Sequence, residues 1–261
     1  RQITISGISS QEKKLMVITR NDQFSLDVNI ESESEMMQKA FSVDGDFTAS
    51  AHDPVNNRLF IAGYEKFNLR AYDLNTLSES WQLENYTWEP YHNQNSLYAD
   101  GELFITYKSY YIQSVTSSGV IKFTTPIENN ESPEEIVGVE DYLLVDMQMK
   151  NNSPPSIVVY YRGTGIEKQR ILSTFDVISF HHTESGNTLV TANNESGLIY
   201  EYRIETNYLF QKNSLDEKIN VSETLDGNSV LIGTNSNLKL HNYIHNSFST
   251  ISVSDWITSD I

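Results

Sequence analysis

Aromatic residues gather in one stretch of the sequence that could recognise a ligand. Residues 84–92 read ENYTWEPYH and place Tyr86, Trp88, Tyr91 and His92 close together. Flat rings supply a large contact area at a low cost in conformational entropy, which suits a sugar ring or a peptide. We predict that these four residues bind a ligand or partner. The alternative is that Trp88 and Tyr91 pack between neighbouring structural units as part of the core.

Two further segments carry polar groups that could serve a binding site. Residues 128–135 read ENNESPEE, and oxygen-rich loops of this kind can hold Ca²⁺. The D-x-D-x-D-G spacing of a calcium loop is missing from them, which favours a solvated acidic loop. Residues 150–156 contain Asn-Asn-Ser-Pro-Pro, and proline cannot continue a central strand ladder. We therefore expect an exposed loop there, long enough to act as a partial lid.

The six histidines show one repeated placement. His52 and His182 each lie seven residues before an apolar strand centre, Leu59 and Leu189 respectively. A repeated position indicates a repeated structural role, which we expect to be bonding the turn that follows the strand. The spacing of the histidines does not indicate a zinc site, so we predict no metal ligands and no cofactor.

Known catalytic motifs are missing from the sequence. It contains no G-x-S-x-G, H-E-x-x-H, P-loop or G-x-G-x-x-G pattern, so we predict no catalytic residue. The absence of cysteine excludes disulfides, thiolate zinc sites and cysteine nucleophiles. The formal net charge of −17 disfavours nucleic acid and anionic membrane surfaces as partners. No apolar run approaches the ~20 residues that span a bilayer, so we predict no membrane insertion.

A repeat of the whole sequence positions these segments. Turn residues precede each apolar centre, and an alternating polar and apolar run follows it, which predicts short strands joined by hairpins. Three hairpins for each unit give a four-stranded antiparallel sheet. The spacings between successive centres are 44, 44, 41, 45 and 42 residues, and the centres are Leu15, Leu59, Leu103, Leu144, Leu189 and Leu231.

Residues 51–76 and 182–206 fit the pattern of turn, apolar strand, polar turn and aromatic-ended strand best. In this pattern the chain resembles the WD40-like and quinoprotein-like β-propeller superfamily. The Trp-Asp dipeptide that names the WD40 family is replaced by Tyr72-Asp73, Tyr202-Arg203 and His241-Asn242. The resemblance implies an all-β chain, a six-bladed β-propeller of four-stranded antiparallel blades, with seven blades as the alternative.

We expect residues 1–261 to form a single propeller domain. The tail, residues 253–261, closes the ring in this interpretation or begins a seventh blade in the alternative. A blade of this size cannot bury both of its faces alone, so neighbouring blades must cover one another. The approximate blade limits are 1–41, 42–84, 85–126, 127–173, 174–212 and 213–252.

The resemblance also implies where a ligand would lie. With the strands of a blade named a to d, the d–a and b–c connections share one rim, and the three candidate segments above fall on it. We predict a non-enzymatic binding or scaffold protein that presents this rim to a protein, peptide or glycan. The alternative is a hydrolase-like or lactonase-like enzyme with its site in the axial funnel. A third reading is a purely structural domain of a larger chain.

The expected location rests on composition and on the first residue. A chain that starts at Arg1, lacks cysteine and is strongly acidic leads us to expect a processed, exported protein of the periplasm, cell surface or extracellular space. A cytoplasmic scaffold is the alternative.

Overall fold

The structure is a computed structural model, and it divides into two compact units, Arg1–Ile136 and Val137–Ile261. None of the described helical segments is long and apolar enough to cross a membrane. The described residues are 3–9, 14–20, 25–32, 35–44, 47–63, 69–83, 94–107, 111–128, 131–149, 154–183, 187–193, 196–226, 228–235 and 237–251.

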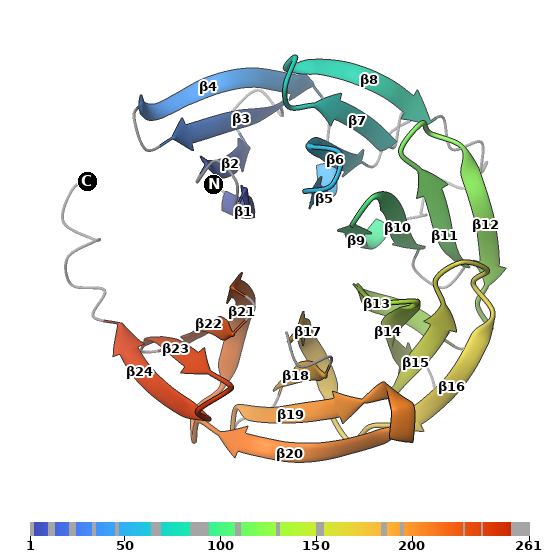
Figure 1. The fold of residues 1–261 in the computed structure, drawn as a ribbon, viewed down its shortest axis with the longest axis vertical. Coiled ribbons are helices and arrows are strands. Elements are labelled where there is room, and N and C mark those ends of the chain that lie inside the picture. The colour runs from blue at the N-terminus through green and yellow to red at the C-terminus, as the bar shows by residue number, and fades with distance from the viewer. Residues whose placement is uncertain are drawn as a thin grey trace. The chain divides into compact units, whose positions relative to one another are not determined.

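The first unit contains three four-stranded sheets, and each is an antiparallel meander in chain order (Figure 1). The first sheet consists of β1 (Ile3–Ser9), β2 (Lys14–Arg20), β3 (Ser25–Ser32) and β4 (Glu35–Asp44). The second consists of β5 (Phe47–Asp53), β6 (Arg58–Gly63), β7 (Leu69–Asp73) and β8 (Ser78–Leu83). The third consists of β9 (Gln94–Ala99), β10 (Glu102–Tyr107), β11 (Tyr111–Thr116) and β12 (Ile121–Pro126).

Three further meanders follow, and the first of them begins with β13, which spans the boundary between the units. The fourth sheet consists of β13 (Glu131–Val139), β14 (Tyr142–Met149), β15 (Ser156–Tyr161) and β16 (Glu167–Leu172). The fifth consists of β17 (Asp176–His182), β18 (Thr188–Asn193), β19 (Leu198–Arg203) and β20 (Tyr208–Ser214), with the 3₁₀ turn η1 (Ile204–Thr206) before β20. The sixth consists of β21 (Ile219–Asp226), β22 (Ser229–Thr234), β23 (Leu238–Asn242) and β24 (Ser247–Ile251).

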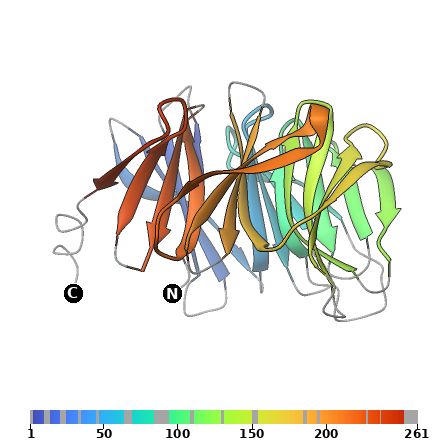
Figure 2. The same cartoon turned by 90° about the horizontal axis from the view of Figure 1, so that it is seen from below.

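Within each unit, the first strands of successive sheets lie beside one another. In the first unit β1 lies beside β5 and β5 beside β9, and in the second unit β17 lies beside β21. Figure 2 shows the pronounced twist of the strands of the second unit, drawn in orange and red. Neighbouring sheets therefore cover one another's faces, as the repeat predicts.

The tight turns use residues that tolerate a positive φ. Asn57 (φ 49°), Gly101 (φ 74°) and Glu140 (φ 52°) lie in the turns between the first and second strands of their sheets. The fully buried carboxylate of Asp53 joins two of these turns, because it accepts the backbone N–H groups of Val55 at 3.0 Å and of Gly101 at 2.9 Å. The turn residues of the sequence thus also connect neighbouring sheets.

The core lies between the sheets and is richest in the second strands. Leu59–Ala62 of β6 and Leu143–Val145 of β14 are buried along their whole length. In the first unit, β6 packs against the first sheet on one face and against the third sheet on the other, which explains why its residues are apolar on both faces. The fourth strands are the most exposed, and β8 and β16 contain no buried residue. The apolar centres Leu59, Leu103 and Leu144 of the repeat thus lie in second strands, where the core is richest.

The structure corrects the prediction of a solvated acidic loop at residues 128–135. Residues 131–135 belong to β13, and Glu131 and Ser132 are only 4% and 5% exposed. Pro133 is tolerated because β13 is an edge strand of its sheet and can lack one donor. Residues 35–44 form strand β4.

Candidate functional site

The aromatic site predicted from the sequence lies outside the described residues. Tyr86, Trp88, Tyr91 and His92 fall in the segment 84–93, between β8 and β9. The prediction that they bind a partner therefore stays a prediction. Residues 150–153 of the expected lid also fall outside the described part, and Pro154 and Pro155 lead directly into β15.

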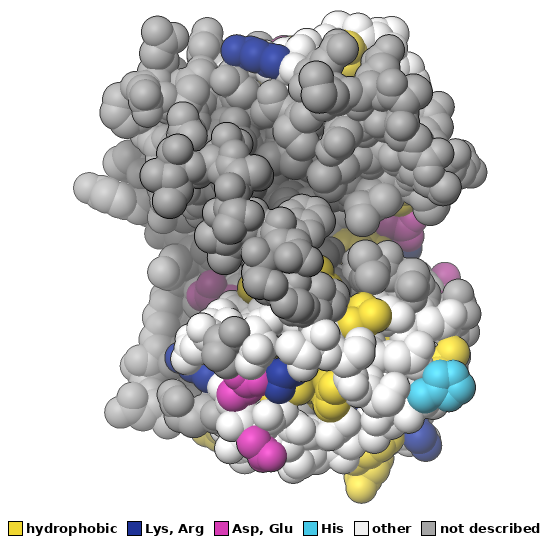
Figure 3. Space-filling model, turned by 90° about the vertical axis from the view of Figure 1, so that its left-hand side faces the viewer, with side chains coloured by type: hydrophobic (Ala, Val, Ile, Leu, Met, Phe, Trp, Pro, Cys, Tyr) yellow, Lys and Arg dark blue, Asp and Glu magenta, His cyan; other side chains and the backbone are white. Residues whose placement is uncertain are grey.

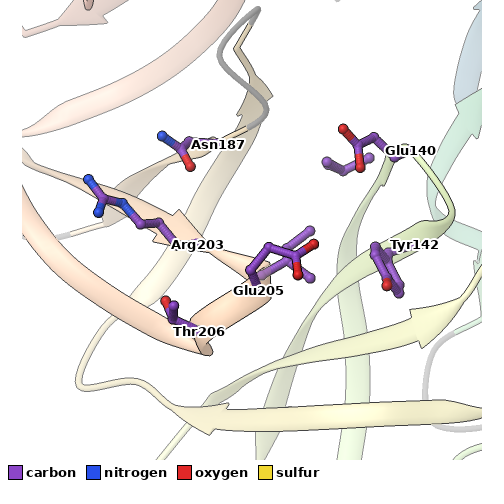
Figure 4. A pocket seen from close by; sticks show the side chains of 8 residues that line it. Glu140, Tyr142, Asn187, Arg203, Glu205 and Thr206 are labelled. Carbon is purple, nitrogen blue, oxygen red and sulfur yellow. The ribbon is translucent and has the colours of Figure 1, made fainter.

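A cavity of about 300 Å³ opens at the other end of the strands, in the second unit. It lies among the β13–β14 turn, the β17–β18 turn and the η1 turn that joins β19 to β20 (Figure 4). Its volume is at the lower limit of ligand pockets, which suits a single long side chain better than a large ligand. The lining residues are Val139, Glu140, Tyr142, Asn187, Arg203, Ile204, Glu205 and Thr206.

A buried carboxylate fixes one wall of this cavity. Glu201 of β19 is 5% exposed and accepts hydrogen bonds from Asn187 Nδ2 at 3.0 Å and Arg203 Nε at 3.2 Å. Its second oxygen, Oε2, accepts from Lys212 Nζ at 2.7 Å. A charged group that is removed from water needs such partners, and the three donors satisfy it. Asn187 and Arg203 are therefore held in place from behind the cavity.

The η1 turn is fixed by a second set of bonds on the opposite face of β19. Tyr202 is fully buried, and its hydroxyl donates to Asn207 Oδ1 at 2.8 Å. Gln169 Nε2 donates to the Tyr202 hydroxyl at 2.9 Å and to the carbonyl oxygen of Ile204 at 2.8 Å. Asn207 ends the turn in the left-handed conformation (φ 50°). The cavity thus borders a turn whose backbone is anchored to neighbouring strands.

Tyr142 forms an aromatic part of the opposite wall. Its ring is tilted against that of Tyr161, with centroids 5.8 Å apart. The ammonium group of Lys168 lies 4.4 Å from the centroid of the Tyr142 ring, within the range of a cation–π contact. The electron-rich face of this ring therefore already accepts a cation in the folded chain.

Two acidic side chains complete the cavity. Glu140 lies at the tip of the β13–β14 turn and Glu205 lies in η1, and both are exposed. In Figure 4 the carboxylate of Glu205 is directed towards Tyr142, and the guanidinium group of Arg203 is directed the other way. Neither carboxylate has a hydrogen-bond or ion-pair partner among the described residues. The open part of the cavity is therefore acidic.

The structure corrects the predicted equivalence of His52 and His182. His52 pairs with Leu59 across its hairpin, but Leu189 pairs with His181. The β17–β18 turn is one residue longer than the β5–β6 turn, so the register moves by one. Burial lowers the pKa of His52, and a hydrogen bond that the ring makes with the side chain of Asn57 in the following turn opposes that shift. The expected turn contact therefore exists at His52.

His181 contacts a chain of hydroxyl groups between β17, β18 and β21, in which Ser222 and Thr191 are buried and Thr224 is exposed. Its Nδ1 lies 2.9 Å from Thr224 Oγ1, and its Nε2 lies 2.9 Å from Ser222 Oγ. Ser222 Oγ in turn lies 2.7 Å from the hydroxyl of Thr191, which donates to the carbonyl oxygen of Ser179 at 3.2 Å. These contacts join the fifth sheet to the sixth.

The directions of these bonds follow from the last acceptor. A carbonyl oxygen can only accept, so Thr191 uses its proton there and accepts from Ser222. Ser222 then accepts from Nε2–H of His181, and Nδ1 accepts from Thr224. Burial, followed by the repulsion of nearby His241, lowers the pKa of His181 to about 3, which keeps the ring neutral. In a nucleophilic Ser–His pair the imidazole accepts the serine proton, so this network has the opposite polarity and is structural.

The metal-binding capacity of the described part gives no further site. No group of three His, Asp or Glu side chains among the described residues could hold a metal ion. On the face shown in Figure 3, hydrophobic and charged side chains of the described residues are interspersed with polar ones. The cavity at the turns of the second unit is therefore the candidate functional site.

Comparisons with known proteins identify the fold. No family model matches the chain, and no curated protein matches it. Solved structures do match: the β-propeller domain of Cps50 (Swd1) from Myceliophteria thermophila has a TM-score of 0.70 and 12% sequence identity, and the match covers 95% of this chain and 85% of that one. The WD40 β-propeller domain of Doa1 also has a TM-score of 0.70, at 11% identity, with coverages of 97% and 82%.

A computationally designed protein, Ika8, matches as well, with a TM-score of 0.67, 11% identity and coverages of 94% and 71%. Identities this low show the fold alone. The chain therefore has the fold of a β-propeller with four-stranded antiparallel blades. The described residues form six such sheets, the number predicted from the repeat, and the tail 253–261, which was expected to close the ring or to begin a seventh blade, lies outside them. The resemblance to WD40-like propellers is confirmed at the level of architecture.

Sequence reasoning missed the cavity because it examined the d–a and b–c connections. The cavity lies at the a–b and c–d turns, at the opposite ends of the strands. One signal was present: Glu140 and Glu205 are acidic residues in turns of neighbouring repeats. Their closeness depends on how the two blades pack, which a repeat pattern does not specify.

Proposed function

We propose that this chain is a non-enzymatic binding module, and that a protein or peptide partner contacts the cavity at the turns of the second unit. The observation that carries this proposal is a cavity bounded by anchored turns. Glu201 holds Asn187 and Arg203, and Gln169 holds the carbonyl oxygen of Ile204. Side chains that are fixed before binding lose little entropy when a partner docks, so such a surface supports recognition.

The fold supports the same function. Propellers present loops and turns on a rigid scaffold of stacked sheets, and binding residues gather on such connections. The hydroxyl chain around His181 is oriented as a structural network, which gives no support to a nucleophilic enzyme at that position. The aromatic residues 86–92 are a second predicted contact, and replacing Trp88 and Tyr91 with alanine tests it separately.

The test fills the cavity without disturbing the sheets. Thr206 is exposed at the cavity, so Thr206→Trp places a large ring in its mouth. The control is Gly163→Trp in the β15–β16 turn of the same unit, where an added Cβ meets no atom within 4 Å. Proteins captured from an extract of the source cells are quantified for wild type and both variants.

We expect wild type and Gly163→Trp to capture equal amounts of a partner. Thr206→Trp should capture at least about tenfold less of it, because blocking one contact of this size removes on the order of 1.4 kcal/mol of binding free energy. If every captured protein is retained equally by both variants, the cavity is not the binding surface. Circular dichroism and urea midpoints of the three proteins verify that the fold is preserved.

A further inference from the structure

We propose that the cavity takes the cationic side chain, arginine or lysine, of the partner's contacting segment, and this proposal rests on the binding function proposed above. The carboxylates of Glu140 and Glu205 would hold the charged group. Val139, Ile204 and the Tyr142 ring would contact the apolar stem of that side chain. The proposal combines a concave site, its charge and its apolar floor.

The two carboxylates face the cavity from separate turns. Glu140 is placed at the turn tip by a left-handed backbone conformation (φ 52°), and the Glu140 carbonyl oxygen accepts from Arg162 Nη1 at 3.5 Å. Glu205 lies in the anchored η1 turn. Because the side chains of Glu140 and Glu205 lack partners among the described residues, a ligand cation would provide the first ion pair for each of them.

The guanidinium group of Arg203, which lines the cavity, does not compete for this place. Arg203 donates to Glu201 at 3.2 Å, and its guanidinium carbon lies 5.0 Å from the centroid of the Phe210 ring. Both contacts hold Arg203 on the side of the cavity away from Tyr142 (Figure 4). Within the fifth sheet, the guanidinium group of Arg203 is thus already stabilised by a carboxylate and an aromatic ring.

The floor of the cavity suits the stem of a long basic side chain. Val139 is buried and Ile204 is 7% exposed, so both present apolar surface beneath the acidic rim. Arginine and lysine bury an aliphatic stem along such surface and keep the charge at its edge. A neutral apolar ligand would leave the two carboxylates without a partner, and an anionic ligand would be repelled by them.

The charge of the whole chain acts in the same direction. A net charge of −17 attracts basic segments over a distance of about a Debye length and raises their rate of encounter. This long-range attraction does not select a place on the surface. The selection must come from the cavity, and the experiment has to separate the two effects.

The probe is Nα-acetyl-arginine N-methylamide, and its matched neutral analogue is the same compound built on citrulline. Binding is followed by chemical-shift changes in ¹H–¹⁵N spectra of the whole chain at low salt. We expect saturable shifts at Glu140, Tyr142 and the residues of η1, with the citrulline compound at least about fivefold weaker. The corresponding lysine compound shows whether an ammonium group is also accepted.

Two variants assign the recognition to the carboxylates. Glu140→Gln and Glu205→Gln keep the shape of the cavity, and each should weaken the arginine compound about two- to fivefold. The control is Asp141→Asn, which removes one exposed carboxylate from the same turn but does not line the cavity. It should leave the affinity unchanged within about 1.5-fold.

Three outcomes overturn the proposal: no saturable shifts at the cavity, equal binding of the citrulline compound, or an equal loss in Asp141→Asn, which would indicate long-range attraction only. These outcomes can be distinguished from a failure of the binding function proposed above. If Thr206→Trp loses a partner and the arginine compound does not bind, the cavity is a binding surface with another specificity. If the arginine compound binds as expected, the cation site stands independently of the capture experiment.

Discussion

The acid sensitivity of the fold should depend on one buried histidine. His181 is 1% exposed, and burial together with the repulsion of His241 lowers its pKa to about 3. The unfolded chain has no such environment, so its imidazole titrates near 6.5. As the pH falls below about 6.5, the imidazole of His181 becomes protonated in the unfolded state but stays neutral in the folded state. The free energy of unfolding therefore decreases.

The size of this effect follows from the two pKa values. Above pH ~6.5 the His181 imidazole is neutral in both states and does not lower the free energy of unfolding. Between pH ~6.5 and pH ~3 the free energy of unfolding falls by about 1.4 kcal/mol per pH unit. Between pH ~7.5 and pH ~4.5 the loss is therefore about 3 kcal/mol, a large part of the stability of a typical domain. Burial lowers the pKa of His241 as well, which adds to the decrease in the same direction.

The measurement compares wild type with His181→Gln by urea unfolding at several pH values. Glutamine cannot titrate, and its amide can still donate to Ser222. The variant should be less stable at neutral pH, but the difference should shrink by about 3 kcal/mol by pH ~4.5. The carboxylates contribute equally to the pH dependence of unfolding in both proteins, so their contribution cancels in the difference. His182→Gln, at an exposed position of the same strand, should follow wild type. Parallel pH profiles of wild type and His181→Gln would refute this reasoning.

Three stability predictions follow from single contacts, each measured as a change in the urea midpoint. Asp53→Ala leaves the N–H of Gly101 without its acceptor and should cost about 2–3 kcal/mol, whereas an equal midpoint would show that the turns hold independently. Gly197→Ala should cost more than about 2 kcal/mol, because φ is +58° and an added Cβ would collide with the carbonyl oxygen of Glu217. Glu201→Ala should cost about 3 kcal/mol by removing a buried carboxylate from its three donors, and a smaller cost in Glu201→Gln would assign part of that cost to hydrogen bonding.

The fold could be predicted because the sequence pattern of each blade is local: it consists of short strands and the turns that join them. Alternating strands and turn residues such as Asn57 and Gly101 fix the hairpins, and a hairpin is a short-range structure. The second strands are apolar on both faces, as in Leu59–Ala62, which indicates that each sheet needs neighbours on both sides. The count of six sheets follows from these two features without any long-range information.

The local errors have physical causes at particular residues. The acidic stretch at Glu131 was expected to be a loop because charge and Pro133 argue against a strand, but an edge strand tolerates both. The equivalence of His52 and His182 failed because one additional residue in a turn shifts every pair of the hairpin. Sequence spacing counts residues, whereas register depends on the turn that closes the hairpin.

The cavity was out of reach for a different reason. Glu140 lies in the fourth blade and Glu205 in the fifth, so their proximity is set by packing between sheets. The sequence shows that both turns are acidic, but it does not show that Gln169 and Tyr202 anchor the η1 turn beside the cavity that Glu140 also lines. A site of this kind becomes visible only when the side chains that support the turn are placed.

The two buried networks of the second unit differ in what they can do. Around His181, every hydrogen bond ends on a hydroxyl or carbonyl group of the protein. Both nitrogens of the ring are therefore already bonded, and neither is left to bind a ligand. Around Glu201, the donors Asn187 and Arg203 lie on the surface of the cavity, and fixing them also fixes the limits of the open space beside Glu205. A polar network that ends at a cavity gives part of that cavity a fixed shape, because Asn187 and Arg203 are already held by Glu201 before a partner binds.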